Sequence, residues 1–275
     1  TAETARYANL AKMGQSWSKP TIANVQWKGK CRLVMFVGGG YDPGYETFNY
    51  NQTNGMGAGV YMFDANTGEF LWSTYDAVKT PATAGTTLIG DGDYLKYSVV
   101  SQIKGVDRDG DGDVDHLYFG DLGGQVFRVD LNSTHGATDT VANYASQITR
   151  IYNGHVDGGV SPRFYEMPAF TVYQGTGGLF AVISIGSGNR STPLLGKQVN
   201  GAYIVNGETT ALNTTLTDDA IYNIYDTVVT TKTPATATLG TSPTRTNLFA
   251  ITNSNRESNA ITSGQTAPAN LAANK

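Results

Sequence analysis

The chain is a succession of short apolar runs, rich in β-branched and aromatic residues, separated by clusters of glycine, asparagine, aspartate and proline. Such runs predict β-strands, because branched and aromatic side chains pack well on a pleated surface and the separating residues favour turns. Three units repeat one order of strands. The first is expected at 22–27, 33–37, 60–64 and 70–72, the second at 97–103, 117–121, 126–130 and 148–152, and the third at 168–173, 180–187, 202–206 and 221–225.

The repeated unit predicts an all-β fold. Asp64, Asp130 and Asn206 end the third strand of their units, at unequal spacings along the chain. A four-stranded sheet repeated with loops of variable length is typical of a β-propeller, which has about 4–8 blades. We expect a modified β-propeller of four-stranded antiparallel blades, with about three blades, too few to close a ring, in this chain. A β-sandwich would explain the strands but not the repeated order of motifs.

The same pattern suggests domain boundaries. We expect a partial β-propeller domain over 1–230. Its units are expected at about 15–80, 95–155 and 165–230. From 231 to 275 the composition shifts to threonine, alanine, asparagine, serine and proline. This shift predicts a mostly irregular segment with one short strand at 248–251.

Charge and cysteine content narrow the possible functions. The formal net charge is −4 and no stretch gathers lysine and arginine, so we expect no nucleic-acid surface. No apolar run reaches the roughly 18 residues of a membrane-spanning helix, and we expect no span in this chain. Cys31 is the sole cysteine, and we expect it to be buried at the start of a strand. His116, His135 and His155 show no spacing typical of a catalytic triad or a zinc site.

One stretch, from 107 to 115, has aspartate at every second position. The five residues are Asp107, Asp109, Asp111, Asp113 and Asp115. Unpaired carboxylates at this density repel one another, and Arg108 is the sole cation within the run. Ca²⁺ takes carboxylate and carbonyl oxygens, whereas Mg²⁺ loses water reluctantly and rarely receives an all-protein cage. The stretch therefore predicts a calcium site.

The spacing matches the first half of an EF-hand loop. With Asp107 at position one, Asp109 and Asp111 occupy positions three and five. Gly112 occupies position six, where the chain must turn sharply and a residue without Cβ can do so. Position twelve, which is glutamate in an EF-hand, is Tyr118. The second half of the motif is therefore missing.

The remaining ligands are expected to be the backbone carbonyl of Asp113 and the side chain of Asp115. The sequences on either side of the loop, 97–103 and 116–119, predict strands rather than helices. We therefore expect a nine-residue calcium loop between two strands. The alternative is a solvated acidic hairpin turn, because aspartate and glycine are ordinary turn residues.

Three motifs then indicate a family. Trp-Ser-Lys-Pro at 17–20 opens the first unit, and the acidic loop runs straight into Leu-Tyr-Phe-Gly-Asp-Leu-Gly-Gly-Gln-Val-Phe-Arg-Val-Asp-Leu at 117–131. Ile-Tyr-Asn-Ile-Tyr-Asp at 221–226 closes the third unit. Together these motifs resemble the C-terminal domain of the PilC/PilY family of type IV pilus tip-associated adhesins and biogenesis factors. The most specific part is 107–131.

The resemblance implies a modified β-propeller with a calcium loop in one blade, and calcium occupancy that controls pilus extension against retraction. It implies Ca²⁺ ligands at the side chains of Asp107, Asp109, Asp111 and Asp115 and at the carbonyl of Asp113. It further implies roles in pilus biogenesis, twitching motility and cell adhesion. The implied partners are type IV pilus (minor pilin) components and host or abiotic surfaces. The implied location is the bacterial cell surface, at the pilus tip or outer membrane, reached through the periplasm.

Other functions remain open. The run from Asp64 to Trp72 resembles a docking motif of quinone-dependent dehydrogenase propellers, but only the first unit has it. A packed hairpin is the favoured interpretation, and we expect no enzyme activity. Another alternative is an adhesion scaffold in which calcium is purely structural. The tyrosine-rich loop 41–57 is either a contact surface or a long hairpin ordered by its own aromatic residues.

Overall fold

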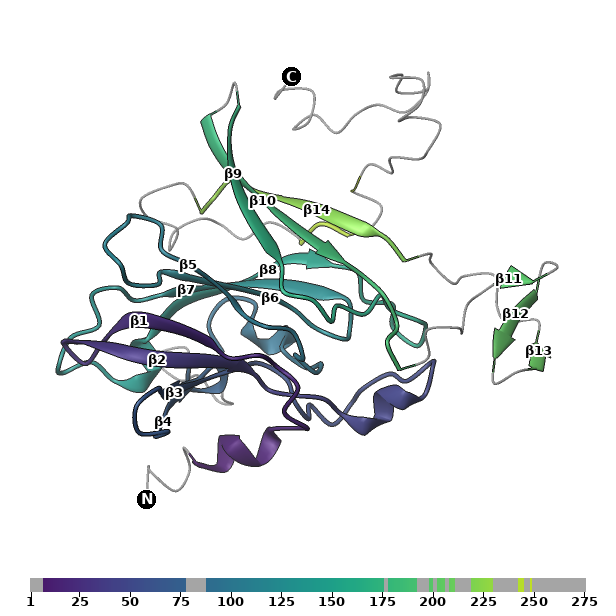
Figure 1. Cartoon of the computed structure of the whole chain (residues 1–275), viewed down its shortest axis with the longest axis horizontal. Helices are drawn as coiled ribbons and strands as arrows, with labels where there is room; N and C mark the ends of the chain where they lie inside the picture. The colour runs from purple at the N-terminus through teal and green to yellow at the C-terminus, as the bar shows by residue number, and fades with distance from the viewer. Residues whose placement is uncertain are drawn as a thin grey trace.

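The computed structural model of the chain describes residues 7–77, 88–175, 178–191, 198–199, 202–205, 208–210, 219–229, 242–244 and 248. Within these residues the fold is all-β, as predicted, and Figure 1 shows its antiparallel sheets. Short 3-10 helices connect some of the strands, at Asn9–Lys12 (η1), Pro43–Glu46 (η2), Thr74–Asp76 (η3), Gly92–Tyr94 (η4) and Val141–Asn143 (η5). No helix in the described part is long and apolar enough to cross a membrane.

The first sheet confirms the strands predicted for the first unit. Its strands are β1 (Thr21–Trp27), β2 (Lys30–Gly38), β3 (Val60–Asp64) and β4 (Phe70–Ser73), paired in chain order. Lys28 and Gly29 join β1 to β2 with φ values of 52° and 75°, the left-handed conformation that a two-residue hairpin turn requires. Asp64 closes the β3–β4 turn by accepting hydrogen bonds from the backbone N–H groups of Asn66 and Thr67.

The second sheet corrects the prediction for the opening strand of its unit. Its strands are β5 (Lys104–Val106), β6 (His116–Gly120), β7 (Gln125–Leu131) and β8 (Ala145–Asn153), again in chain order. The strand predicted at 97–103 was wrong. The backbone N–H of Val99 donates to the carbonyl of Gly57, and the carbonyl of Val99 accepts from the N–H of Gly40. The carbonyl of Ser98 accepts a hydrogen bond from the N–H of Leu122. Because these backbone groups already have partners, this stretch runs between the first sheet and the β6–β7 turn instead of pairing with β6.

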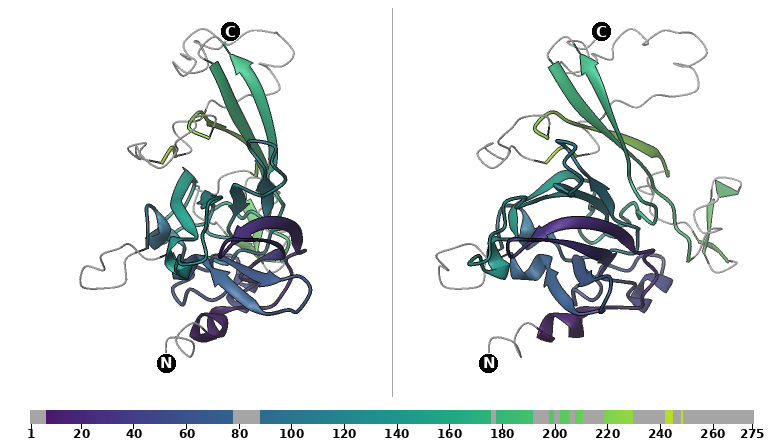
Figure 2. Two further views of the ribbon diagram at one scale, coloured as in Figure 1. Left: turned by 90° about the vertical axis from the view of Figure 1, so that its left-hand side faces the viewer. Right: turned by 60° about the vertical axis from the view of Figure 1, so that its left-hand side comes forward.

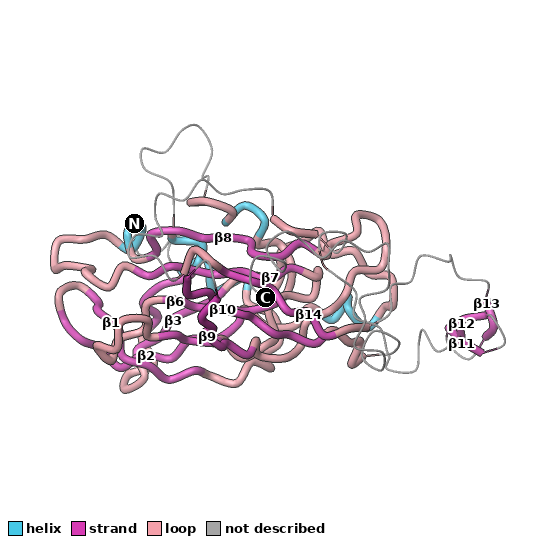
Figure 3. Tube along the Cα trace, turned by 90° about the horizontal axis from the view of Figure 1, so that it is seen from above, coloured by secondary structure: helices cyan, strands magenta, loops and turns pink. Residues whose placement is uncertain are grey.

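The third sheet corrects the strand order of its unit. It consists of β9 (Ala169–Gly175), β10 (Gly178–Gly186) and β14 (Ile221–Asp226), in the order β14-β10-β9. The predicted third strand, 202–206, instead belongs to a small separate sheet. That sheet contains β11 (Gln198–Val199), β12 (Ala202–Val205) and β13 (Glu208–Thr210), and Figures 1 and 3 show it standing apart.

The turn after β14 explains this correction. Asp226 accepts hydrogen bonds from the backbone N–H groups of Val228 and Val229, as Asp64 does after β3. The third-unit counterpart of Asp64 is therefore Asp226 and not Asn206. An insertion carrying the small sheet separates β10 from β14 in sequence, so that spacing alone could not identify the match.

The three large sheets pack face to face in succession, as the two views of Figure 2 show. One apolar cluster, which includes Trp72 and Phe119, fills the space between the first and second sheets. Another, which includes Tyr152 and Ile183, lies between the second and third sheets. The second sheet is thus covered on both faces, which accounts for the complete burial of β6 and β7. Successive packed sheets are compatible with propeller blades, and the propeller itself stays a prediction.

The beginning of the described chain covers part of the outer face of the first sheet, near β3 and β4. Leu10 and Met13 pack against a cluster that contains Tyr61 and Phe70. At the other end of the chain, the strand predicted at 248–251 lies outside the described residues except for Leu248. That residue packs against the cluster between the second and third sheets.

Candidate metal centre

The acidic loop closes the hairpin between β5 and β6, as predicted. The last strand pair is Val106 with His116, and the backbone N–H of Asp115 donates to the carbonyl of Val106 at 2.9 Å. Residues 107–115 therefore form a loop whose two ends are held by a strand pair. This arrangement confirms the expectation of a nine-residue loop between strands rather than between helices.

Two glycines and the first aspartate shape the loop. Gly110 and Gly112 have φ values of 80° and 96°, a region that side chains other than glycine rarely adopt. The carboxylate of Asp107 accepts hydrogen bonds from the backbone N–H groups of both glycines, at 2.7 and 2.9 Å. The sharp turn expected at Gly112 is thus present, and Asp107 holds it.

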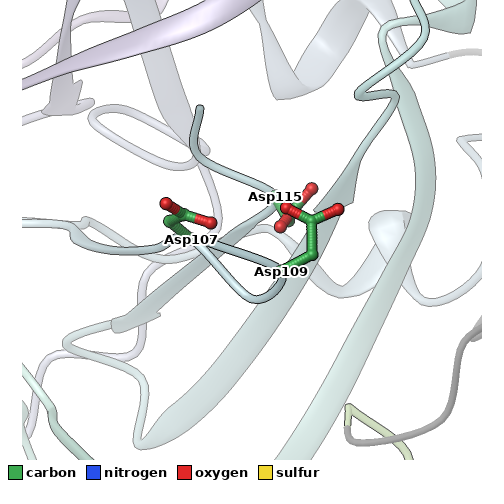
Figure 4. Close-up of side chains that lie close together, drawn as sticks. All are labelled: Asp107, Asp109 and Asp115. Atoms are coloured by element: carbon green, nitrogen blue, oxygen red, sulfur yellow. The ribbon is translucent and has the colours of Figure 1, made fainter. Parts of the chain in front are cut away.

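Three carboxylates come together at this turn. Oxygens of Asp107, Asp109 and Asp115 lie within 4.8 Å of one another, and Figure 4 shows the three side chains. Two oxygens on opposite sides of one Ca²⁺ lie about 5 Å apart, given ligand distances of roughly 2.3–2.6 Å. The donor set and its spread therefore fit one such ion.

The electrostatics of the cluster favour a cation. Asp115 is buried, whereas Asp107 and Asp109 are exposed. Burial raises the pKa of the Asp115 carboxyl, and the hydrogen bond from the backbone N–H of Arg108 at 2.8 Å opposes this rise. The negative charge of Asp109 adds a smaller increase. A bound cation would offset both the burial and the like charge.

The other two aspartates lie outside this cluster. Asp111 is exposed and accepts a hydrogen bond from the backbone N–H of Asp113 at 2.8 Å. The side chain of Asp113 is buried, and its carboxylate lies 3.7 Å from the sulfur of Cys31. The structure therefore brings together three of the four predicted side-chain ligands, without Asp111, and it places the side chain of Asp113 against the first sheet.

Cys31 corrects a further expectation. It lies near the start of β2, as predicted, but it is exposed and not buried. Partial desolvation and the neighbouring Asp113 carboxylate raise the pKa of its thiol, so the loop disfavours the thiolate.

Two backbone hydrogen bonds from distant segments anchor the end of the loop. The N–H of Val114 donates to the carbonyl of Asn24 in β1 at 2.9 Å, and the N–H of Leu131 in β7 donates to the carbonyl of Asp115 at 2.7 Å. Sequence analysis missed Asn24, because a backbone contact between segments so far apart leaves no local signal. The loop thus links the first sheet to the second.

His116, which follows Asp115 directly, belongs to a buried ionic cluster. Its Nδ1 lies 2.7 Å from Oδ1 of Asp130. Arg128 contacts Asp130 through Nε at 2.8 Å and donates from Nη1 to Asp226 of the third sheet at 2.6 Å. Tyr118 also donates to Asp226. This cluster, His116, Tyr118, Arg128, Asp130 and Asp226, ties the strand after the loop to the third sheet.

The residues of the dehydrogenase-like motif occupy structural positions. Trp72 is completely buried between the first and second sheets. Its ring packs edge-on against the ring of Tyr144, with the two ring centroids 5.2 Å apart. Hydrogen bonds from the Thr67 and Asn66 backbone lower the pKa of Asp64, and Arg32 lies 3.3 Å away. These contacts favour the packed-hairpin interpretation.

The tyrosine-rich loop 41–57 is ordered by internal contacts. Tyr41 and Tyr45 are buried, and the buried Asp42 accepts a hydrogen bond from the Tyr50 hydroxyl at 2.8 Å. Arg163 reaches in from a later segment and donates to the carbonyl of Tyr45 at 2.7 Å. These contacts support the interpretation as a self-packed loop over that of a contact surface.

Comparison with known proteins adds little to this geometry. No protein-family model matches the chain, and no curated protein matches it significantly. Among solved structures, it is similar to the crystal structure of the Pseudomonas aeruginosa PilY1 C-terminal domain, with 20% sequence identity and a TM-score of 0.49. That alignment covers 86% of this chain and 42% of the other, so this chain spans less than half of its neighbour. A TM-score below 0.5 is too low to establish a shared fold or function.

Proposed function

We propose that this chain is a calcium-binding β-propeller module of a type IV pilus tip-associated adhesin. The observation that carries the calcium proposal is the cluster of Asp107, Asp109 and Asp115 at a glycine turn between two strands. The pilus assignment is supported by the resemblance of motifs 17–20, 107–131 and 221–226 to the PilC/PilY family. The proposed partners are pilus components and host or abiotic surfaces, and the proposed location is the bacterial cell surface.

Each loop residue has a distinct proposed role. Asp107, Asp109 and Asp115 supply side-chain oxygens, and Asp111 joins them by turning its exposed carboxylate away from the Asp113 N–H. Asp113 contributes its backbone carbonyl, since its side chain is buried next to Cys31. Ca²⁺, which accepts irregular sets of oxygens, suits this loop better than Mg²⁺, which demands near-ideal octahedral geometry.

The proposed role is binding and not catalysis. Calcium that binds the ordered loop but not a disordered one stabilises the module by RT ln(1 + [Ca²⁺]/Kd), about 2.7 kcal/mol at a hundred times Kd. A ligand that binds two conformations of a protein equally well does not change the equilibrium between them. Control of pilus extension, retraction and twitching therefore requires that the hairpin of β5 and β6 differ between its calcium-bound and calcium-free forms.

Calorimetric titration of the chelator-treated chain is expected to show saturable one-to-one calcium binding. Asp107→Ala should abolish that heat, because it removes a ligand and the acceptor that holds Gly110 and Gly112 in the turn. The matched control is Asp157→Ala, an exposed aspartate outside the loop, which should bind as the unchanged chain does. Absence of binding heat in the unchanged chain would reduce the acidic run to a solvated turn.

Amide hydrogen exchange tests the proposed switch in the hairpin. Calcium should slow exchange across β5, the loop and β6, because the bound ion fixes the loop on which the hairpin closes. Amides of the β9–β10 hairpin, which lie in another sheet, serve as the internal control and should not change. Equal protection of the loop with and without calcium would contradict a regulatory role.

A second candidate function is an adhesion scaffold in which calcium is purely structural. The two backbone anchors of the loop, from Val114 to Asn24 and from Leu131 to Asp115, favour it because they hold the loop end without an ion. Twitching motility of cells that carry Asp107→Ala distinguishes the two. Normal surface display with altered twitching indicates regulation, whereas loss of the displayed protein indicates a structural ion.

A further inference from the structure

β9 is an unusually open edge strand. It pairs only with β10 among the described strands, and its register with β10 is continuous over the whole strand. Side chains on both of its faces are exposed, including Val172 at 48% and Tyr173 at 51%. Figures 1 and 2 show the β9–β10 hairpin projecting beyond the packed sheets. Among the described residues, no other strand pairs with its outer row of backbone N–H and C=O groups.

The other long edge strands have protected edges. β1 has a bridge from Asn24 to Asp113, and the carbonyl of Asn24 accepts from Val114. β8 has two register shifts, and the carbonyl of Ile148 accepts from the backbone of Asp91. The remaining edge strands of the first two sheets, β4 and β5, are short. Bulges, short strands and covering segments are the usual means of preventing edge-to-edge pairing.

β9 carries none of these protective features. Residues 169–175 include no charged residue and no proline, and no described segment outside the hairpin donates a hydrogen bond to the strand. β14, the other edge of the same sheet, differs because every second residue in it is buried. A strand added beside β14 would need apolar side chains on the face that continues its buried side. A strand added beside β9 would not need them, because most side chains of β9 are exposed on both faces. The open edge therefore fits an added β-strand.

We propose that β9 pairs with β9 of a second copy of this chain, antiparallel and about a two-fold axis at Val172. Full-length pairing of the strand places Val172 opposite Val172 of the partner subunit, and Thr171 opposite Tyr173 of the partner subunit. Pairs of aromatic and β-branched residues stabilise antiparallel sheets, and the strand has no charge that would repel its own copy. The two third sheets would join into one continuous sheet.

Single-cysteine cross-linking tests both the dimer and its register. In a Cys31→Ser background, Val172→Cys should form a disulfide-linked dimer under mild oxidation, since directly opposed residues have Cα atoms about 4.5–5.5 Å apart. Gln174→Cys is the matched control. Its two copies would be offset by about 14 Å along the strand, four residues at roughly 3.4 Å each, which is beyond the reach of a disulfide. Equal cross-linking of the two variants, or none for Val172→Cys, would overturn the proposed register.

Light scattering after size exclusion tests the association without a cross-link. The unchanged chain should shift from monomer to dimer as concentration rises, and Val172→Lys should remain monomeric because two lysines would face each other. Ile221→Lys, on the exposed face of β14 at 78% exposure, should dimerise as the unchanged chain does. Melting curves that coincide for both lysine variants confirm that neither is unfolded. A chain that stays monomeric throughout refutes the dimer and leaves the edge for a strand of another protein.

Discussion

Replacing Arg128 with alanine is expected to destabilise the chain by about 3–5 kcal/mol, the usual cost of removing one partner from a buried ion pair. Arg128 is buried, and its guanidinium contacts Asp130 at 2.8 Å and Asp226 at 2.6 Å. Burial alone would lower its pKa, but these two carboxylates raise it above the usual value. Without the arginine, two buried carboxylates would lack their common cation.

Urea denaturation of the unchanged chain and of Arg128→Ala measures this cost. Arg32→Ala is the matched control, because Arg32 is 35% exposed and lies 3.3 Å from Asp64, so its loss should cost about 0–1 kcal/mol. Similar small effects for both variants would contradict the assigned role of Arg128. That result would mean that the apolar cluster alone holds the second and third sheets together.

The position of this cluster connects stability to the proposed calcium site. Asp115 lies in the loop cluster, and the next residue, His116, contacts Asp130 at 2.7 Å. Arg128 then joins Asp130 to Asp226 in the third sheet. A shift of the hairpin end would therefore disturb buried charged groups. Calcium dependence of the melting temperature should be larger in the unchanged chain than in Arg128→Ala if this connection transmits loop ordering.

Local patterns were sufficient to predict most strands of the first two sheets. The runs at 33–37 and 60–64 form β2 and β3 because their branched and aromatic residues suit a pleated sheet. In β2 the residues Val34 and Phe36 are buried, whereas Leu33 is exposed. The acidic loop could also be predicted from the sequence. Aspartate at every second position, together with glycine at position six, is a signal contained within one short segment. Three of the four side chains expected as ligands lie close together.

The sequence failed where the decisive partner lies far away. The run at 97–103 has strand-forming residues, but backbone groups within it form hydrogen bonds with Gly40, Gly57 and Leu122 instead of with a neighbouring strand. The match between Asp64 and Asp226 was hidden by the small inserted sheet. Asp113 and Cys31 come together only because the loop packs on the first sheet. No periodicity within a single segment encodes such contacts.

Stability should also fall as pH rises from about 4 to about 7, because of Asp121. This residue is completely buried in the β6–β7 turn, and burial raises its pKa to about 7, although hydrogen bonds from Gln125 and Gly123 oppose the rise. An unfolded aspartate has a pKa of about 3.9. Between these values the folded chain binds a proton that the unfolded chain does not. This stabilisation is therefore fully present below about pH 4. As pH rises from there to about 7, it is lost at about 1.4 kcal/mol per pH unit, about 4 kcal/mol in total.

Asp121→Asn isolates this contribution because its amide cannot titrate. The amide oxygen can still accept from the backbone N–H groups of Gly123 and Gln125, now 3.0 and 2.8 Å from the carboxylate. The variant loses the bond from the Gln125 side chain, which shifts its stability at every pH without changing the slope. The stability of the unchanged chain minus that of the variant should thus fall by about 4 kcal/mol from pH 4 to pH 7, so that the variant becomes the more stable of the two near pH 7. Asp157→Asn, at an exposed position, should follow the unchanged chain throughout.

The direction of that slope decides which force dominates at Asp121. A carboxylate that accepts several backbone hydrogen bonds can be held ionised, whereas burial in a low-dielectric interior favours the neutral acid. A fall in the stability of the unchanged chain relative to the variant as pH rises means that burial outweighs the three hydrogen bonds. A constant difference would mean that the turn holds an ionised carboxylate in the core. In that case Arg150, which lowers the pKa of Asp121 and whose side chain donates to Gln125 at 2.8 Å, would supply the compensating positive charge.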